Sequence, residues 1–394
     1  MLSQRNLALG RRRSSIRELF EYGRRRKAEI GEENVFDFSI GNPSVPTPEH
    51  VGSVMRRLID ECDPVQLHGY TSAAGDADVR AAVADNLNRR FGGSVSPDLI
   101  YMTCGAAASL TITLSAIMCE GDEVIVLTPC FPEYRVFIES AGGRVVEVPC
   151  DGDLQPDIGA MAAALTDRTK AVIINSPNNP TGAVYTRERL KGLAELLGSR
   201  KNPIYLISDE PYRELTYGEA EVPFVPSFYR RTVICYSFSK SLSLPGERIG
   251  YICVSPEMDE ARDLFDAVCG AGRSLGFVCA PSLLQRTVAE CLDDTADINV
   301  YRRNRDRLYT ALTDMGYSAV HPDGAFYLFL KALEDDAVAF CERAKRHELL
   351  LVPSDDFGCR GYARVSYCVT PEQIERALPA FEALYNEYES EKTK

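Results

Sequence analysis

The sequence predicts an α/β fold with a mostly parallel sheet flanked by helices and a second, smaller α+β domain. Between residues 95 and 255, short runs rich in Val, Ile and Tyr alternate with longer stretches of helical periodicity. This alternation is typical of a parallel sheet that helices cover on both faces. From about residue 295 the pattern changes to long charged helices and a few short strands, which indicates the second domain.

Each expected strand of the large sheet is a short apolar run bounded by polar, Gly or Pro residues. In chain order the runs are Leu99–Thr103, Glu123–Leu127, Arg144–Val148, Ala171–Asn175, Ile204–Ser208, Thr232–Tyr236 and Ile249–Val254. The helices expected between them are Ala106–Cys119, Tyr134–Ala141, Ile158–Leu165 and Arg187–Leu197. Ligands of parallel sheets bind outside the carboxyl ends of the strands, so functional residues are expected directly after these runs.

The smaller domain is expected to begin near residue 291. Its expected elements are a helix over Ile298–Met315, strands over Tyr317–Val320 and Ala325–Phe329, and helices over Ala337–His347 and Pro371–Tyr388. The predicted organisation is an N-terminal segment, residues 1–45, that joins this domain, a large domain over residues 46–290, and the small domain over residues 291–394.

Charge and composition exclude several classes of protein. The chain has 44 Lys and Arg against 57 Asp and Glu, for a net charge of −13, which argues against nucleic-acid binding. Residues 1–30 are an exception, with a net charge of +6. We interpret them as an amphipathic helix with a solvated basic face and an apolar face built from Ile16, Leu19, Phe20 and Gly23; a nucleic-acid contact is the alternative.

Cysteine usage and hydropathy predict the compartment. The 13 cysteines are scattered without a CxxC pair, and the four histidines lie far apart in the chain. Reduced cysteines, a cytoplasmic location and no bound metal are therefore expected. Apolar stretches fall short of the roughly 20 residues of a membrane helix, and the start of the chain lacks a secretory pattern.

A lysine and an aspartate follow two of the expected strands. Lys240 comes shortly after the run Thr232–Tyr236, and a partly desolvated amine there would be a good nucleophile for an imine. Asp209 directly follows Ile204–Ser208, where it could partner a protonated ring nitrogen. The plainer alternatives are a surface Lys240–Arg248 pair and a helix cap at Asp209.

Two loops strengthen the chemical interpretation. Asn175-Ser176-Pro177-Asn178-Asn179-Pro180-Thr181-Gly182 has more constrained positions than an ordinary turn needs, and it would hold an Asn side chain toward the cleft. Thr103-Cys104-Gly105-Ala106-Ala107-Ala108 joins a strand to a helix. Its small residues would let backbone N–H groups approach a phosphate.

Together these motifs resemble the class I aminotransferases of the pyridoxal-phosphate (PLP)-dependent transferase fold, fold type I. The resemblance covers nearly the whole chain, from Gly41-Asn42-Pro43 to Arg364. It implies that residues 46–290 bind PLP, that Lys240 holds it as an internal aldimine and shuttles a proton, and that Asp209 partners its ring nitrogen. The remaining PLP contacts implied are Tyr212 and Asn179 at the ring oxygen, Phe131 on the ring face, and Ser237, Ser239, Arg248, Gly105, Ala106 and Ala107 around the phosphate.

The resemblance also implies a substrate site and an assembly. Arg364 corresponds to the arginine that binds the substrate α-carboxylate, and Asn179 and Gly41 also line that site. Tyr70 corresponds to a tyrosine that reaches the phosphate from the second subunit, so a homodimer is expected. Arg273 is a candidate for a second, distal carboxylate, and Arg17 is a weaker one. The implied reaction moves an amino group between an L-amino acid and a 2-oxo acid, with the aspartate/2-oxoglutarate type as one option.

Three other functions remain as alternatives. A PLP-dependent β-lyase, of the cystathionine or cysteine-conjugate type, would use the same residues, as would a racemase or decarboxylase. A transcription regulator built on the same fold would need a winged-helix domain before the large domain, and 45 residues are too few for one. A nicotinamide dehydrogenase is disfavoured because no GxGxxG motif opens the first strand–helix turn.

Overall fold

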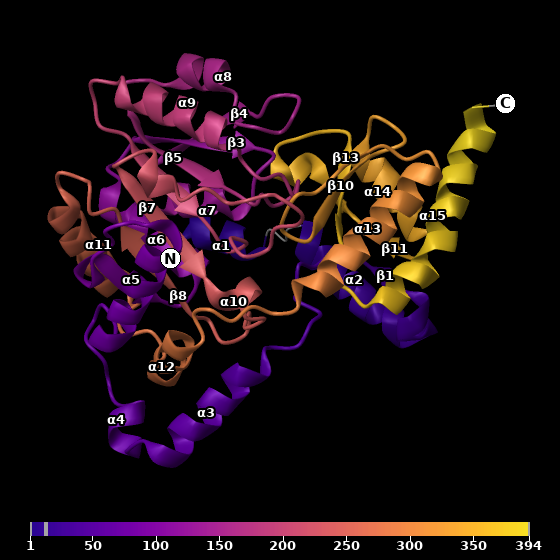
Figure 1. Ribbon diagram of the computed structural model, residues 1–394. Coiled ribbons are helices and arrows are strands. Elements are labelled where there is room, and N and C mark those ends of the chain that lie inside the picture. The colour runs from indigo at the N-terminus through magenta and orange to yellow at the C-terminus, as the bar shows by residue number, and fades with distance from the viewer. Residues whose placement is uncertain (1, 12–14, 393–394) are drawn as a thin grey trace. The chain divides into compact units, whose positions relative to one another are not determined.

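The computed structural model describes residues 2–11 and 15–392, and it divides the chain into two compact units (Figure 1). Unit 1 consists of Met1–Ser44, Pro180–Gly182 and Asn299–Lys394. Unit 2 consists of Val45–Asn179 and Ala183–Ile298. Each unit has its own β-sheet structure and its own apolar core.

Unit 2 is built on a seven-stranded sheet with the order β2-β8-β7-β6-β5-β3-β4. Neighbours from β7 to β4 are parallel, whereas β8 is antiparallel to both β7 and β2. The predicted mostly parallel α/β sheet is therefore confirmed, with β8 as the reversed strand. The strands are β2 (Ile100–Thr103), β3 (Glu123–Thr128), β4 (Arg144–Pro149), β5 (Thr169–Asn175), β6 (Tyr205–Asp209), β7 (Thr232–Ser237) and β8 (Gly250–Val254).

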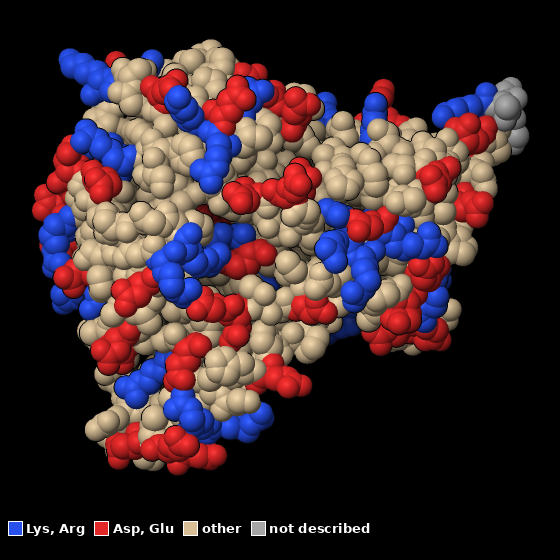
Figure 2. Space-filling model, viewed as in Figure 1, with Lys and Arg blue, Asp and Glu red and all other residues tan. Residues whose placement is uncertain are grey.

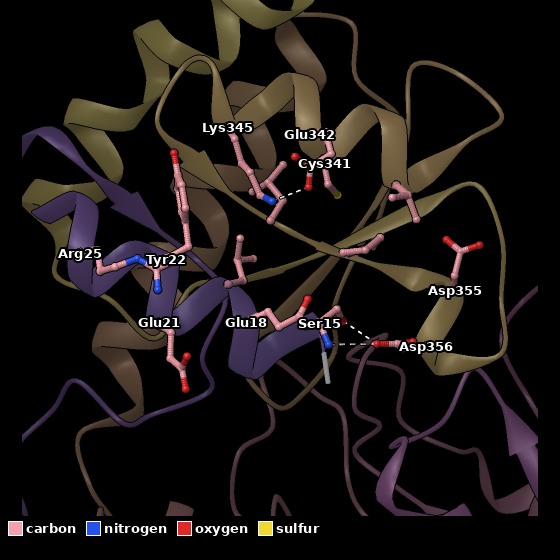
Figure 3. Close-up of a pocket in the computed structure, with 14 residues that line it drawn as sticks. Ser15, Glu18, Glu21, Tyr22, Arg25, Cys341, Glu342, Lys345, Asp355 and Asp356 are labelled. Atoms are coloured by element: carbon pink, nitrogen blue, oxygen red, sulfur yellow. Dashed lines mark hydrogen bonds and ion pairs between the residues drawn. The ribbon is translucent and has the colours of Figure 1, made fainter. Parts of the chain in front are cut away.

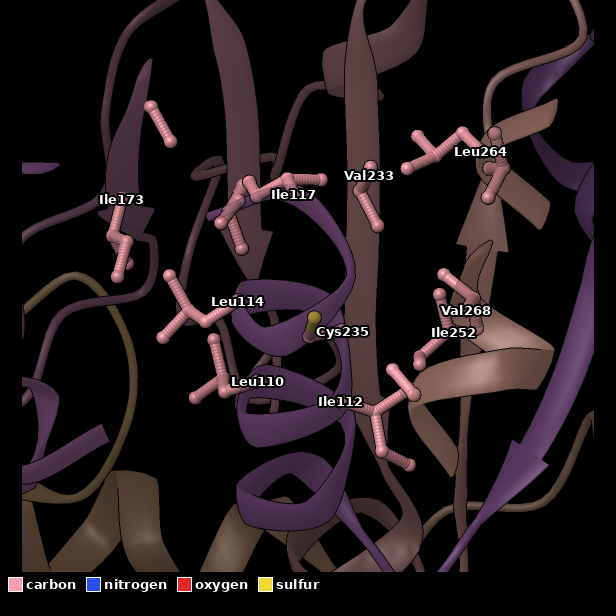
Figure 4. Close-up of a cluster of buried hydrophobic side chains, with 14 of the residues drawn as sticks. Leu110, Ile112, Leu114, Ile117, Ile173, Val233, Cys235, Ile252, Leu264 and Val268 are labelled. Carbon is pink, nitrogen blue, oxygen red and sulfur yellow. The ribbon is translucent and has the colours of Figure 1, made fainter. Parts of the chain in front are cut away.

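Helices cover this sheet on both faces because successive strand residues point to opposite sides. Val233 and Cys235 pack against α6 on one face (Figure 4), whereas Ile234 and Tyr236 belong to a second cluster with residues of α5 and α12. The helices of unit 2 are α3 (Glu49–Glu61), α4 (Pro64–His68), α5 (Ala77–Phe91), α6 (Ala106–Ile117), α7 (Glu133–Ser140), α8 (Ile158–Ala164), α9 (Arg187–Gly198), α10 (Phe238–Ser241), α11 (Ala261–Leu275) and α12 (Ser282–Glu290).

Unit 1 combines two small sheets with long helices. One sheet pairs β1 (Phe36–Asp37) with β11 (Leu349–Leu350), and the other has the order β12-β13-β10-β9. The strands of the second sheet are β9 (Ala319–Val320), β10 (Tyr327–Lys331), β12 (Val352–Pro353) and β13 (Tyr362–Ser366). The helices are α1 (Gln4–Arg11), α2 (Ser15–Ile30), α13 (Ile298–Asp314), α14 (Ala337–Lys345) and α15 (Pro371–Lys392). The sequence did not predict β13, the strand that carries Arg364.

The basic N-terminal segment forms two helices, α1 and α2, with residues 12–14 outside the described part. Leu19 and Gly23 are buried in unit 1 as predicted, but the prediction for Phe20 is wrong, since 45% of it is exposed. A Cβ on Gly23 would lie 2.7 Å from Leu350 Cδ1, so a larger residue there would have to displace the Leu350 side chain. Helical periodicity groups Phe20 with the apolar face, but the cluster that buries Leu19 with Leu350 and Val352 does not include Phe20.

Acidic side chains of unit 1 contact α2 at several points. Arg26 Nη2 lies 2.7 Å from Glu348 Oε1, and the Ser15 hydroxyl donates to Asp356 Oδ2 at 2.6 Å. Beside this contact α2, α14 and the 3₁₀ turn η4 (Ser354–Phe357) line a pocket of about 500 Å³ (Figure 3). These contacts support the interpretation of the segment as a structural helix.

Acidic and basic side chains are interspersed on the face of the molecule seen in Figure 2, and neither sign of charge dominates there. The 13 cysteines, all in the described part, form no disulfide, and six of them are buried. Within residues 2–11 and 15–392, no helix is long and apolar enough to cross a membrane.

Candidate active site

The candidate site of unit 2 lies at the edge of the sheet where three parallel strands end. In the sheet register Asn175, at the end of β5, is level with Asp209, at the end of β6, and Asp209 is level with Cys235 in β7. Helix α10, which contains Lys240, begins directly after β7. The fold thus brings together at one edge the residues that the sequence places after separate strands.

Asp209 is a buried carboxylate with two different oxygens. Its Oδ2 accepts a hydrogen bond from the Tyr134 hydroxyl at 2.5 Å, whereas Oδ1 has no hydrogen-bond partner within the described residues. Burial raises the pKa of Asp209 to about 7; the bond from Tyr134 opposes this rise and the nearby Glu210 adds to it. A buried oxygen without a partner is costly, so this position suits a cationic N–H donor.

Asn175 links Asp209 to the loop that follows β5. Its Nδ2 donates to the Asp209 carbonyl oxygen at 2.9 Å, and its Oδ1 accepts from the Asn179 backbone N–H at 2.8 Å. Asn175, Asn179 and Tyr212 are all buried. The Asn175 side chain therefore sets both the end of β6 and the loop that presents Asn179.

Four groups gather around the N-terminus of α6. Gly105 caps this helix with φ +88°, and a Cβ there would lie 3.0 Å from Arg248 Nη2. The Ser237 and Ser239 hydroxyls are 2.8 Å apart, and Arg248 Nη1 lies 3.5 Å from Ser239 Oγ. Backbone N–H groups of the first helical turn, which begins with Ala106 and Ala107, two hydroxyls and a guanidinium form a set of donors suited to a phosphate dianion.

Gly250 allows the segments that carry these phosphate donors to pack closely. A Cβ on Gly250 would lie 2.2 Å from the Tyr236 carbonyl oxygen and 2.9 Å from Gly105 Cα. Only glycine therefore lets the start of β8 pass between the end of β7 and the turn before α6. The sequence predicts a role for Arg248 only, and the structural role of the nearby Gly250 follows from the packing.

The other predicted residues of unit 2 lie at its surface or its margin. Phe131 packs edge-on against Tyr134, with ring centroids 5.7 Å apart and an interplanar angle of 86°. Tyr70 is 99% exposed in this single chain. Arg273 is exposed near the end of α11, so the structure does not bring it to a buried position.

Arg364 and Gly41 belong to unit 1. Arg364 is buried, donates from Nη2 to the Ser39 carbonyl oxygen at 2.6 Å, and lies 4.6 Å from the Tyr327 ring centroid and 5.1 Å from that of Phe357. The two rings and the carbonyl oxygen fix the guanidinium plane. A Cβ on Gly41 would overlap Tyr327 Oη, so a larger residue at 41 would displace this ring. Arg17 is exposed on α2.

The contacts of two residues at this edge of the sheet were not expected from the sequence. Tyr134 was predicted only as a helix residue, and Asn175 only as the end of a strand and the first residue of the loop that follows it. A tyrosine in the first turn of a helix that follows a buried strand can reach the strand ends, but this signal is too common to single out Tyr134.

Comparisons with known proteins agree with this geometry. The family model "Aminotransferase class I and II" matches residues 33–381. An aminotransferase structure from Eubacterium rectale is 52% identical, with a TM-score of 0.97, and the match covers 98% of this chain and 99% of that one. The aspartate aminotransferase of Thermus thermophilus with maleate is 32% identical, with a TM-score of 0.87 and coverage of 98% and 99%.

A curated relative points the same way. The aspartate aminotransferase of Thermotoga maritima is 33% identical over 379 residues, which are 94% of this chain and 97% of the relative. The match extends over both units, and the family model includes the strand ends, the α6 turn and Arg364. The chain therefore belongs to the class I and II aminotransferases, and it is an enzyme of that family.

Proposed function

We propose that this chain transfers an amino group between an L-amino acid and a 2-oxo acid, with PLP as its cofactor and Lys240 as the covalent anchor. The family is PLP-dependent. The observation that carries the proposal is Asp209, whose buried Oδ1 has no partner within the described residues. This carboxylate would accept the N–H of a protonated pyridine nitrogen, whose positive charge would favour its ionised form.

Other groups of unit 2 fit the remaining parts of PLP. Ser237, Ser239, Arg248 and the amides of Ala106 and Ala107 would hold the phosphate. Tyr212 and Asn179 would bond to the ring oxygen, and Phe131 would cover the ring face. When bound, PLP supplies an electron sink that stabilises negative charge at the substrate Cα.

The chain's own residues then have separate tasks. Lys240 would hold PLP covalently through Nζ, and the same amine would take the proton from the substrate Cα and return it during the transfer. Arg364 binds the substrate α-carboxylate, because a fixed planar guanidinium can donate two parallel hydrogen bonds. The backbone of Gly41 would lie against the substrate, while the absence of a Cβ at this position makes room for the Tyr327 ring.

For the substrate we propose a dicarboxylic pair of the aspartate/2-oxoglutarate type. Relatives named aspartate aminotransferase, one of them a structure with maleate, support this choice. Arg273 and Arg17 are the candidates for a distal carboxylate, and both are exposed in the single chain. Their exposure is compatible with a role that depends on a second subunit or on a bound substrate.

The proposed reaction is tested by mixing purified protein and PLP with one amino donor (aspartate, glutamate or alanine) and one 2-oxo acid. The expected result is a new amino acid in amounts equal to the consumed oxo acid, fastest with a dicarboxylic pair, together with a visible absorption band that changes when donor alone is added. In a parallel reaction with cystathionine or a cysteine S-conjugate, which carry a leaving group on Cβ, loss of that group with pyruvate and ammonia as products and no new amino acid would instead identify a β-lyase. A protein that stays colourless with PLP would overturn the assignment of Lys240 and Asp209.

We further propose a homodimer in which Tyr70 reaches the phosphate of the neighbouring subunit. Exposed apolar residues near Tyr70 support it: Val65, Leu275, Phe277 and Val278. The two segments that carry them are in contact, since Cys279 Sγ lies 3.3 Å from the Thr71 carbonyl oxygen. Their exposure to water is unfavourable unless a partner covers them.

Light scattering at micromolar concentration is expected to give twice the chain mass. Tyr70→Phe is expected to keep the dimer and to weaken PLP binding by about tenfold, the effect of one hydrogen bond to a charged group. A fully active monomer would contradict the role of Tyr70, whereas a dimer in which Tyr70→Phe binds PLP normally would contradict only the phosphate contact.

A further inference from the structure

Tyr134 contacts Asp209 at the edge of the sheet where the parallel strands end. Its side chain is buried, with 2% exposed, and its hydroxyl lies 2.5 Å from Asp209 Oδ2. Tyr134 sits in the first turn of α7, and its ring is held edge-on by Phe131. Because ring and hydroxyl are both fixed, the bond constrains the rotation of the Asp209 carboxylate as well as occupying one of its oxygens.

The surroundings of Asp209 give this bond an electrostatic role. Burial raises the pKa of Asp209 and the neighbouring carboxylate of Glu210 raises it further, while the hydrogen bond from Tyr134 lowers it. Burial also raises the pKa of Tyr134 well above its usual value, so its hydroxyl stays protonated and donates at every working pH. Among the groups that act on Asp209 in the described chain, Tyr134 is thus the one that favours the ionised carboxylate.

We propose that Tyr134 is a positioning residue that holds Asp209 Oδ2 and leaves Oδ1 to accept the N–H of the protonated PLP ring. This inference rests on the proposed function. In this role Tyr134 does not touch the reacting atoms and acts through Asp209. The Asp209 carboxylate and the ring nitrogen compete for one proton, and the hydroxyl of Tyr134 biases that proton toward the ring.

Tyr134→Phe tests the proposal because it removes the hydroxyl and keeps the ring packed against Phe131. The first readout is the ¹⁵N chemical shift of PLP labelled at its ring nitrogen, which reports directly whether that nitrogen carries the proton. The wild-type protein is expected to show a protonated ring nitrogen, and Tyr134→Phe a shift toward the unprotonated form. The second readout is the dissociation constant of PLP from the apoenzyme, which is expected to rise about tenfold.

Tyr229→Phe is the matched control. Tyr229 is also buried in unit 2, and its hydroxyl donates to the Ile204 carbonyl oxygen at 2.8 Å, at the opposite end of β6 from Asp209. It is expected to lose a similar amount of stability without changing the ¹⁵N shift or PLP affinity. If Tyr134→Phe does not fold, 3-fluorotyrosine incorporated at Tyr134, a stronger donor of nearly the same shape, is expected to keep the ring nitrogen protonated to higher pH than the wild-type protein does.

The outcomes separate this proposal from the proposed function. A wild-type protein that binds no PLP overturns both. A wild-type protein with a protonated ring nitrogen, combined with an unchanged shift and affinity in Tyr134→Phe, overturns only the role of Tyr134. An equal change in Tyr229→Phe would show a general effect of lost hydroxyls and would likewise overturn it.

Discussion

Replacing Lys240 by Ala is expected to lower the rate of amino-group transfer by roughly 10⁴-fold or more, the upper end for loss of a single proton-transferring group. Lys240 is given two tasks, covalent attachment of the cofactor and proton transfer at the substrate Cα, and alanine can perform neither. The measurement is the rate of new amino-acid formation at saturating donor and 2-oxo acid. Treatment with borohydride, followed by peptide mapping, is expected to fix the cofactor to the Lys240 peptide in the wild-type protein only.

Two further variants test whether Lys240 acts through its reactive amine or only through its positive charge. Lys240→Arg keeps a positive charge but has no amine that can deprotonate and form the covalent bond, so it is expected to be as inactive as the alanine variant. Lys191→Ala, at an exposed position of α9, is the control for a lost lysine and is expected to keep wild-type activity. Activity of Lys240→Arg within tenfold of the wild-type rate would show that Lys240 acts only through its charge.

Replacing Arg213 by Met is expected to lower the free energy of unfolding by about 3–5 kcal/mol, the cost of leaving a buried charge without its partner. Both side chains of the Glu210–Arg213 pair are only 3% exposed. Arg213 Nε donates to Glu210 Oε2 at 2.6 Å, Nη1 donates to the Tyr251 hydroxyl at 2.9 Å, and the guanidinium lies 4.5 Å from the Tyr236 ring centroid. Methionine fills much of the volume but leaves Glu210 unpaired.

Urea unfolding monitored by circular dichroism measures this loss. The double variant Glu210→Gln with Arg213→Met is expected to recover most of it, because no unpaired charge then stays buried. Arg230→Met is the control, since its partner Asp259 lies at 2.8 Å and both side chains are more than half exposed. Breaking that exposed pair is expected to cost less than about 1 kcal/mol. Equal losses in the buried and exposed pairs would contradict this account.

The Glu210–Arg213 pair also matters for the site, because Asp209 and Tyr212 belong to the same short segment. Asp209 ends β6, Glu210 and Arg213 anchor the residues that follow, and Tyr212 lies between the anchors. Residues 209–214 have the sequence Asp-Glu-Pro-Tyr-Arg-Glu, and this pattern gives no sign that an ion pair within it is buried. Burial of this pair is a property of the packing against Tyr236, Tyr251 and Phe91.

The sequence by itself determined the α/β class, the strands of the large sheet to within about two residues, and the order in which candidate residues follow those strands. These properties are largely local: a short run rich in Val, Ile and Tyr and bounded by turn residues favours a strand, and strand ends in a parallel sheet share one edge. The match of Lys240, Asp209, Asn179 and Arg248 to a family pattern needed only their spacing in the chain.

Only the tertiary structure decided which side chains touch. The reversed direction of β8, the strand β13 beneath Arg364, the exposure of Phe20 and the contacts made by Tyr134 and Asn175 depend on residues far apart in the chain. Tyr134 and Asp209 are 75 positions apart, and their hydrogen bond exists because α7 and the end of β6 pack at the same edge of the sheet. Periodicity assigns a residue to a face, but the depth of burial and the partner at that depth come from long-range packing.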